Sequence, residues 1–174
     1  MPFALLAAIA VLLFVSLAAF APMQLNIMNE RAYGQGLQAN LRRLSTIRYC
    51  VFHHSAGPGM QSLADIAAVQ RERLGADGVV YHYVLDASGR CFQCNGLERI
   101  TWHARGGNSY GVGVCLLGNF ENAPPTERQY ETARQLFQRL RRDYPKLDAK
   151  RHGEFSQTAC PGKYFNIQRI TTGL

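Results

Sequence analysis

The stretch IRYCVFHHSAGPG, residues 47–59, combines a predicted strand with a pair of histidines. Its first eight residues are rich in β-branched and aromatic side chains, which favours a β-strand, and the Ser, Ala, Gly and Pro residues after them predict a loop. Successive side chains on a strand point to opposite faces, so only one of His53 and His54 can point into a given site. Sites are often built where a strand meets a loop, so this strand end is a candidate site.

Two amphipathic helices are predicted downstream of this strand. Ser62 followed by Asp65 resembles a capping box that opens a helix over residues 63–74, and a glycine follows as its stop. A second capping pair opens a long helix over residues 127–143, with a proline beyond its end. A final helix is expected near residues 162–171.

Strand patterns alternate with these helices. Residues 79–86 form a predicted strand that turns at residues 87–90 into a short returning strand through residues 91–94, and residues 111–118 read as a buried strand. A chain of 174 residues has room for one domain with a core. We therefore expect an α/β fold: a single mixed central β-sheet with helices packed on it.

The N-terminus carries a long apolar run. The first 29 residues have no charged side chain, and Phe3 to Ala21 is apolar apart from Ser16, close to the ~20 residues that span a bilayer as a helix. We expect residues 1–28 to form an N-terminal transmembrane helix or signal-anchor segment in contact with a lipid bilayer. A cleaved signal peptide and a buried core helix are the alternatives. Ala19-Phe20-Ala21 resembles the A-x-A motif of a signal-peptide cleavage site, but Pro22 directly after it disfavours cleavage.

Residues 29–46 are polar and predict a juxtamembrane connector, which leaves residues 47–174 as the expected folded domain. The connector holds the pair Arg42-Arg43, and the whole chain has a formal charge of +7, from 19 Lys and Arg against 12 Asp and Glu. This charge favours an anionic neighbour such as acidic lipid or a wall polymer. No nucleic-acid partner is expected, because no recognition motif or aromatic-basic array is present.

Five cysteines are too few for a disulfide scaffold in a chain of this length, and their odd number leaves at least one outside an intramolecular bridge. Cys91 and Cys94 form a C-x-x-C pair without the second pair that a four-cysteine zinc knuckle needs. A local disulfide or two unlinked thiols are expected there, with redox or metal work as the alternative. Cys50 and Cys115 lie within predicted strands and are expected in the core.

The segment RHGEFSQTACPG, residues 151–162, places His152 eight residues before Cys160. A hydrolytic zinc site needs three protein ligands and one open position, so this pair by itself does not decide whether the segment belongs to a zinc site. The further candidates are His53, His54, His82, His103, Cys50, Cys91, Cys94 and Cys115.

Four segments resemble one known family in the order in which they occur. VFHHSAG, VVYHYVLDASGR, WHARGGNSYGVGVCLLGNF and RHGEFSQTACPG are similar to the motifs of the type 2 N-acetylmuramoyl-L-alanine amidases, a zinc family that also contains the peptidoglycan recognition proteins. The resemblance runs from about residue 47 to the C-terminus. It does not cover the apolar run, the connector or the C-x-x-C pair.

The resemblance implies a set of site residues. His53, His152 and Cys160 correspond to the three ligands of one Zn²⁺ per chain. Tyr81 and Thr158 correspond to the catalytic residues, a tyrosine and a polar residue two positions before the cysteine ligand. His103, Arg105 and Asn108 fall in the loop that borders the substrate groove in relatives. His54 and His82 match no ligand and are expected to be structural neighbours.

The function implied by the resemblance is zinc-dependent hydrolysis of the amide between N-acetylmuramic acid and L-alanine in peptidoglycan, in wall remodelling or as a phage endolysin. The alternative is a non-catalytic, membrane-anchored peptidoglycan-binding module; the presence of Cys160 favours the enzyme. Such an enzyme is expected on the periplasmic or extracellular side of the membrane. Release or secretion after cleavage, and a virion membrane, are the other locations considered.

Overall fold

The computed structural model describes residues 24–35 and 39–172. A six-stranded mixed sheet with the order β1-β5-β4-β7-β3-β8 forms its centre, and a two-stranded sheet pairs β2 with β6. The single mixed central sheet expected from the sequence is confirmed. The strands of the main sheet are β1 (Ile27–Asn29), β3 (Tyr49–His54), β4 (Tyr83–Leu85), β5 (Cys91–Gln93), β7 (Gly111–Leu116) and β8 (Asp148–Arg151); the small sheet holds β2 (Asn40–Leu41) and β6 (Arg99–Ile100).

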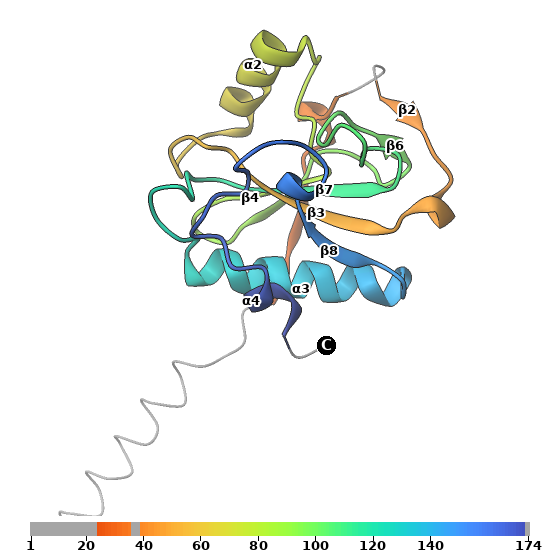
Figure 1. Cartoon of the computed structure of the whole chain (residues 1–174). Coiled ribbons are helices and arrows are strands. Elements are labelled where there is room, and N and C mark those ends of the chain that lie inside the picture. Colours follow the sequence, from red (N-terminus) through yellow and green to blue (C-terminus); the bar gives the residue numbers. More distant parts are fainter. Residues whose placement is uncertain (1–23, 36–38, 173–174) are drawn as a thin grey trace, which may run out of the picture.

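Helices cover both faces of the main sheet. Figure 1 shows α3 and α4 on one side of it and α2 on the other. We call the face that packs on α3 the α3 face and the opposite one the α2 face. The helices are α2 (Leu63–Leu74), α3 (Glu127–Asp143) and α4 (Gln168–Thr171), with short 3-10 turns η1 (Arg31–Tyr33), η3 (Leu44–Thr46) and η4 (His152–Glu154).

Alternation along β3 and β7 divides their side chains between the two faces. On the α3 face the two strands join a large apolar core, to which they contribute Cys50, Phe52, Val112, Val114 and Leu116. On the α2 face lie His53 and its register partner Cys115, with a smaller apolar cluster that includes Ile66 of α2. The main core therefore lies under α3, and the histidine of β3 is turned away from it.

The helix starts follow the predicted capping chemistry. Ser62 accepts from the Asp65 backbone N–H while the Asp65 side chain accepts from the Ser62 N–H, and Gly75 ends α2 in the left-handed region with φ of 65°. Thr126 and Gln129 form the same box at α3. The final helix is shorter than expected, because only Gln168–Thr171 is helical.

Two strand predictions differ from the structure. The strand expected over residues 79–86 is regular only over Tyr83–Leu85, and β8 was not predicted. β8 has the sequence DAKR, which gives no apolar alternation, and it pairs only with β3 at the edge of the sheet. An edge strand can be this polar because one side of it has no strand neighbour.

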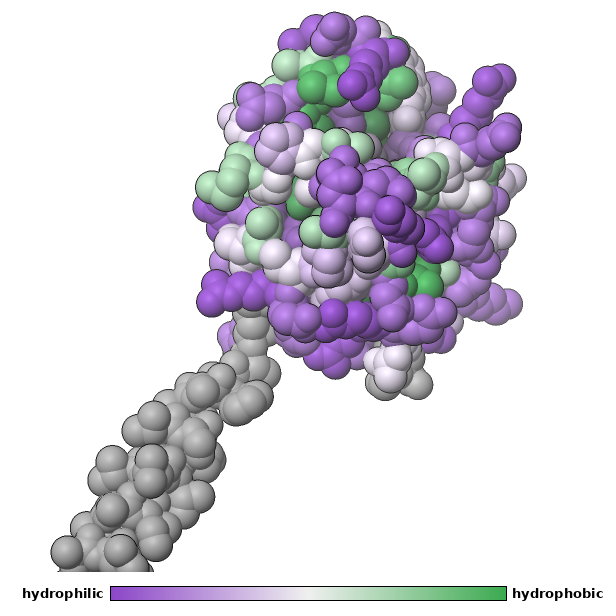
Figure 2. Space-filling model, turned by 60° about the vertical axis from the view of Figure 1, so that its left-hand side comes forward, coloured by the Kyte–Doolittle hydropathy of each residue, from purple (hydrophilic) through white to green (hydrophobic). Residues whose placement is uncertain are grey.

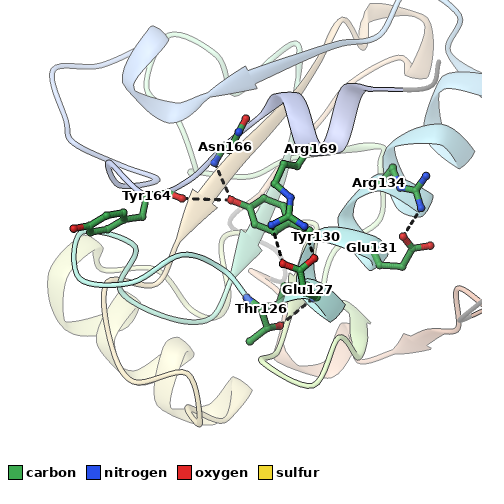
Figure 3. Close-up of polar contacts among 9 residues, drawn as sticks. Thr126, Glu127, Tyr130, Glu131, Arg134, Tyr164, Asn166 and Arg169 are labelled. Atoms are coloured by element: carbon green, nitrogen blue, oxygen red, sulfur yellow. Dashed lines mark hydrogen bonds and ion pairs between the residues drawn. The ribbon is translucent and has the colours of Figure 1, made fainter. Parts of the chain in front are cut away.

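The C-terminal helix is fastened to α3 by a polar cluster (Figure 3). The Arg169 guanidinium carbon lies 4.1 Å from the Tyr130 ring centre, and its nitrogens pair with the Glu127 carboxylate. The Tyr130 hydroxyl accepts from the Asn166 backbone N–H at 2.8 Å and donates to the Tyr164 carbonyl at 3.4 Å. These contacts hold α4 and the segment before it against α3.

The segment expected to be a connector contributes to both sheets. The predicted boundary at residues 28 and 29 falls inside β1, which pairs in parallel with β5, and β2 lies within residues 29–46. Of the apolar run predicted to cross a membrane, residues 1–23 lie outside the described residues. Among residues 24–35 and 39–172, no helix is long and apolar enough to span a bilayer.

The surface is largely hydrophilic on the side seen in Figure 2, as the charge content suggests. A hydrophobic area lies near the top of that view, where α2 is found. The exposed large apolar side chains of α2 are Val69 and Leu74, at 37% and 51% of their full exposure.

Candidate metal centre

Three side chains from separate parts of the chain meet on the α2 face: His53, His152 and Cys160, which we call the metal triad. Their ligand atoms all lie within 4.8 Å of one another, and His53 is buried while the other two are half-buried. The two histidine rings are 4.5 Å apart between centres. No other group of three or more such side chains within the described residues comes this close.

The sheet register explains the meeting of the two histidines. β3 and β8 run parallel with Phe52 opposite Arg151, the last residue of β8, so His53 on β3 and His152, which begins η4 directly after β8, lie at the same carboxyl edge. Cys160 returns to this edge because the Gly153 backbone N–H donates to the Cys160 carbonyl at 3.0 Å. A loop of eight residues thus closes on itself beside the strand ends.

The triad fits a zinc ion by its chemistry and spacing. Two imidazoles and one thiol are ligands that zinc prefers, and three protein ligands leave a fourth position open. The Cys160 Sγ lies 3.8 Å from the His53 Nδ1. Zinc bonds of about 2.3 Å to sulfur and about 2.0 Å to nitrogen in a tetrahedral site hold such a pair about 3.5 Å apart. This pair is therefore close to the separation that one shared zinc requires.

Hydrogen bonds behind His53 fix which nitrogen faces the triad. The His103 Nε2 lies 3.3 Å from the Gly111 carbonyl, which can only accept, so this nitrogen carries the proton. A neutral His103 then accepts at Nδ1, where the His53 Nε2 lies at 3.1 Å and donates. His53 is left with an unprotonated Nδ1, which is the atom that faces Cys160.

Burial keeps this histidine pair neutral. It lowers the pKa of His103 to about 3, and it lowers the pKa of His53 well below the ordinary value, with the neighbouring His103 and His152 adding to the effect. Burial also lowers the pKa of His152. Neutral imidazoles are the form that binds a metal, so the site is prepared for one at neutral pH.

The Cys160 thiol has a raised pKa without a metal. Burial raises it to about 11, although a hydrogen bond from the His54 backbone N–H and the charge of Arg151 act in the opposite direction. A bound cation reverses this balance, because a coordinating thiol is deprotonated outright. His54 itself faces away from the triad, where its Nδ1 accepts from the Phe120 backbone N–H at 3.1 Å.

Two glycines of β7 make room for His103. A Cβ on Gly113 would lie 2.6 Å from the His103 Cγ, and one on Gly111 would lie 3.1 Å from its Cε1. The imidazole therefore lies flat against a strand that has no side chains at these two positions. The glycine alternation in GVGV is thus a packing requirement of the site.

Tyr81 lies at the margin of the triad, with its ring centre 5.1 Å from that of His53. Burial raises the pKa of its hydroxyl well above the ordinary value, and the Cys115 and Cys160 thiols add to this. Hydrogen bonding to Cys115 also raises this pKa, whereas hydrogen bonding to Gln70 acts in the opposite direction. Tyr81 therefore stays protonated and can act as a hydrogen-bond donor.

The other residues carried over from the resemblance occupy different positions. Thr158 is exposed on the loop between the ligands, and its Oγ1 accepts from the Cys160 backbone N–H at 3.2 Å, so its own proton stays available. Arg105 is exposed, and the Asn108 Oδ1 accepts from the Ala104 N–H at 2.6 Å. His103 differs from its expected place beside the groove: at 4% exposure it lies behind His53.

Sequence reasoning missed the group that surrounds His103. Arg42, assigned to the connector, and His82, read as a neighbour, form a polar layer with the Gly111 and Gly113 backbone. The signal available was the alternation of glycine with valine in the β7 sequence, which indicates close approach of another group. Nothing in the sequence says that this group is an imidazole, or that an arginine 69 residues earlier reaches Gly111.

Comparison with known proteins finds relatives named as amidases, endolysins and peptidoglycan-recognition proteins. A mouse N-acetylmuramoyl-L-alanine amidase is 32% identical over 117 residues, 61% of this chain and 22% of the mouse protein. The endolysin of Enterobacteria phage K11 is 31% identical over 101 residues, 55% of this chain and 66% of the endolysin. Peptidoglycan-recognition protein 2 of Holotrichia diomphalia is 23% identical over 68% of this chain and 67% of its own length.

A solved structure shares the fold. The endolysin amidase LysCS from Clostridium intestinale URNW superposes with a TM-score of 0.75 at 24% identity, over 87% of this chain and 96% of that one. Residues 43–163 match the Amidase_2 family, described as N-acetylmuramoyl-L-alanine amidase, and include the whole metal triad. Because this match spans more than half of the chain, the protein belongs to the Amidase_2 family.

Proposed function

We propose that this chain is a zinc-dependent N-acetylmuramoyl-L-alanine amidase that hydrolyses the amide between the lactyl group of N-acetylmuramic acid and the L-alanine of the stem peptide. The observation that carries the proposal is the metal triad, whose three ligand atoms lie within 4.8 Å of one another with the bare His53 Nδ1 facing Cys160. Relatives named amidase and endolysin support the same reaction.

His53, His152 and Cys160 would hold the metal. Two neutral imidazoles and one thiolate leave Zn²⁺ with a net charge near +1. Such an ion would supply Lewis-acid polarisation of a carbonyl and a bound water whose pKa is lowered to about 7. The half-buried setting of the triad reduces screening by solvent, which strengthens these charge interactions.

Tyr81 and Thr158 are proposed as donors to the substrate. As the amide carbonyl is attacked, negative charge develops on its oxygen, and hydrogen bonds directed at that oxygen stabilise the transition state. The Tyr81 hydroxyl keeps its proton because burial raises its pKa, and the Thr158 hydroxyl proton is not used in its bond from Cys160. Arg105 and Asn108 remain proposed contacts of the substrate groove.

The proposed site of action is outside the cytoplasmic membrane, where peptidoglycan lies, with the apolar run Phe3 to Ala21 as its anchor. The charge of +7 is compatible with an anionic wall. Cell fractionation combined with N-terminal sequencing of the recovered chain tests this. An intact chain in the membrane fraction supports the anchor, and a chain that begins after residue 21 supports cleavage.

The test of the activity uses the full chain and purified peptidoglycan, with and without a chelator. Release of free stem peptides that the chelator abolishes and added zinc restores is the expected result. Cys160→Ala should lose both stoichiometric zinc and release. Cys50→Ala, a matched thiol on the α3 face, should keep zinc in its folded fraction.

Two outcomes would contradict the proposal. Full zinc occupancy in Cys160→Ala would show that Cys160 is not a zinc ligand. Tight binding of peptidoglycan without release would favour a binding module, the function suggested by the name of the peptidoglycan-recognition relative.

A further inference from the structure

Arg42, which lies in the segment before β3, contacts the residues that pack behind the metal ligand His53. Arg42 Nη1 donates to the Gly111 carbonyl at 2.7 Å and to the Asn108 carbonyl at 3.1 Å, and its Nε donates to the Leu97 carbonyl at 2.8 Å. Its Nη2 lies 3.0 Å from the His82 Nε2. This half-buried guanidinium therefore binds three backbone carbonyls from separate loops and strands.

One of these carbonyls is shared with the support of the metal ligand. The Gly111 oxygen accepts from Arg42 Nη1 and also from the His103 Nε2 at 3.3 Å. His103 in turn accepts from the His53 Nε2 at 3.1 Å. A continuous line of hydrogen bonds thus runs from Arg42 through Gly111 and His103 to the ring of His53.

The packing around this line leaves little freedom. His103 rests on the bare backbone of Gly111 and Gly113, and its ring meets that of His82 edge-on at 5.7 Å. The His82 Nδ1 accepts from the Gly113 N–H at 3.0 Å, so this ring is also tied to β7. Arg42 is the charged side chain that contacts both β7 and His82.

The charge of Arg42 is retained in this layer. Burial lowers its pKa to about 10, with Tyr144 and Glu98 acting in the opposite direction, so it is protonated at neutral pH. Among the described residues Arg42 takes part in no ion pair within 4.0 Å. Its hydrogen-bonding capacity is directed to carbonyls, for which the rigid five-donor fork of arginine is suited.

We propose that Arg42 is a positioning residue for the metal ligand His53, acting through the Gly111 carbonyl and His103. It holds that carbonyl so that His103 keeps its proton on Nε2 and accepts at Nδ1. His53 then keeps its proton on Nε2 and presents Nδ1 to the metal. The inference rests on the proposed function, because it concerns the same metal site.

The expected effect is on metal affinity. Loss of a partner that orients a metal-binding histidine typically costs 10–100-fold in affinity or activity. Arg42 acts one hydrogen bond further back than His103, so Arg42→Gln should weaken zinc binding by about 10-fold. Arg42→Lys keeps the positive charge but lacks the forked donors of the guanidinium, so its zinc affinity should lie between those of Arg42→Gln and wild type.

The experiment compares full-length wild type, Arg42→Gln, Arg42→Lys and Arg43→Gln. Arg43 is the matched control, since it is the adjacent arginine and is exposed. Zinc affinity is measured by competition with a chromogenic chelator, and Co²⁺ loading by its visible absorption spectrum. Unfolding of the metal-free proteins in urea is recorded in parallel, to separate loss of fold from loss of the site.

The expected result is weaker zinc binding and an altered Co²⁺ spectrum in Arg42→Gln, with Arg43→Gln like wild type. In a double-mutant cycle with His103→Gln, the two losses should be less than additive, because both residues act on His53 through one line. Unchanged metal affinity in Arg42→Gln, or fully additive losses, would overturn the inference even if wild type binds zinc. Wild type that holds no zinc would overturn both the inference and the proposed function.

Discussion

The two faces of the β3–β7 pair are built from the same strands and have opposite compositions. On the α3 face Phe52, Val112, Val114 and Leu116 are fully buried hydrocarbons in the main core. On the α2 face the alternate positions are Val51 and His53 of β3 and Gly111, Gly113 and Cys115 of β7, of which only Val51 is a large apolar side chain. The α3 face thus stabilises the fold by burying apolar side chains. On the α2 face the glycines leave space in which imidazoles can pack.

This difference shows where the fold can tolerate polar groups. A buried histidine costs free energy unless its nitrogens are hydrogen-bonded. His53, His82 and His103 all have such partners on the α2 face. The apolar α3 face supplies the stability that allows this arrangement. Changes to the two faces should therefore separate stability from metal binding.

The largest expected effect on stability comes from Phe52→Ala. Phe52 is fully buried and contacts the rings of Phe137 and Phe165, so truncation leaves a cavity under α3. The free energy of unfolding should fall by about 3–5 kcal/mol, measured by urea denaturation. Zinc per folded molecule should not change. Loss of zinc with normal stability would contradict the assignment of stability to the α3 face and of metal binding to the α2 face.

Tyr81→Phe should act on the rate and spare the metal. Removing one donor to a developing oxyanion typically costs ~10²-fold or more in turnover. The measurements are release of stem peptides and zinc content. Tyr83→Phe is the control, because Tyr83 belongs to the α3-face core. Equal rates in Tyr81→Phe and wild type would remove Tyr81 from the proposed chemistry.

Gly113→Ala tests the room made for His103. The new Cβ would lie 2.6 Å from the His103 Cγ, so the ring must move and the bond to His53 is disturbed. Overpacking of this kind typically costs about 1–3 kcal/mol in unfolding free energy, and zinc affinity should fall with it. Gly75→Ala, with open space at its Cβ, serves as a control for glycine strain alone. A Gly113→Ala protein with native zinc affinity would contradict the packing argument.

A more gradual effect is expected in the pH dependence of the stability of the metal-free protein. Burial holds the pKa of His82 well below its ordinary value and that of His103 at about 3. Below about pH 6.5 the unfolded chain binds protons that the folded chain excludes, so stability falls with falling pH. Each such histidine contributes up to about 1.4 kcal/mol per pH unit. Urea unfolding from pH 7.5 to 5 measures this decline, and a flat profile would contradict neutral, buried histidines.

The sequence alone determined the class of fold and the candidate ligands. The capping boxes at Ser62 and Thr126 fixed the starts of α2 and α3, because capping is local chemistry within four residues. The alternation of β3 separated His53 from His54, since side chains on a strand alternate whatever the tertiary context. Motif order and residue type then selected His53, His152 and Cys160 by resemblance.

Only the tertiary structure decided how these residues meet and what supports them. β8 is too polar to be recognised as a strand, yet its pairing with β3 is what brings His152 beside His53. Arg42 and His103 are 61 positions apart in the chain and meet at one carbonyl oxygen of β7. Such contacts depend on the register and packing of distant strands, and local sequence carries no record of them.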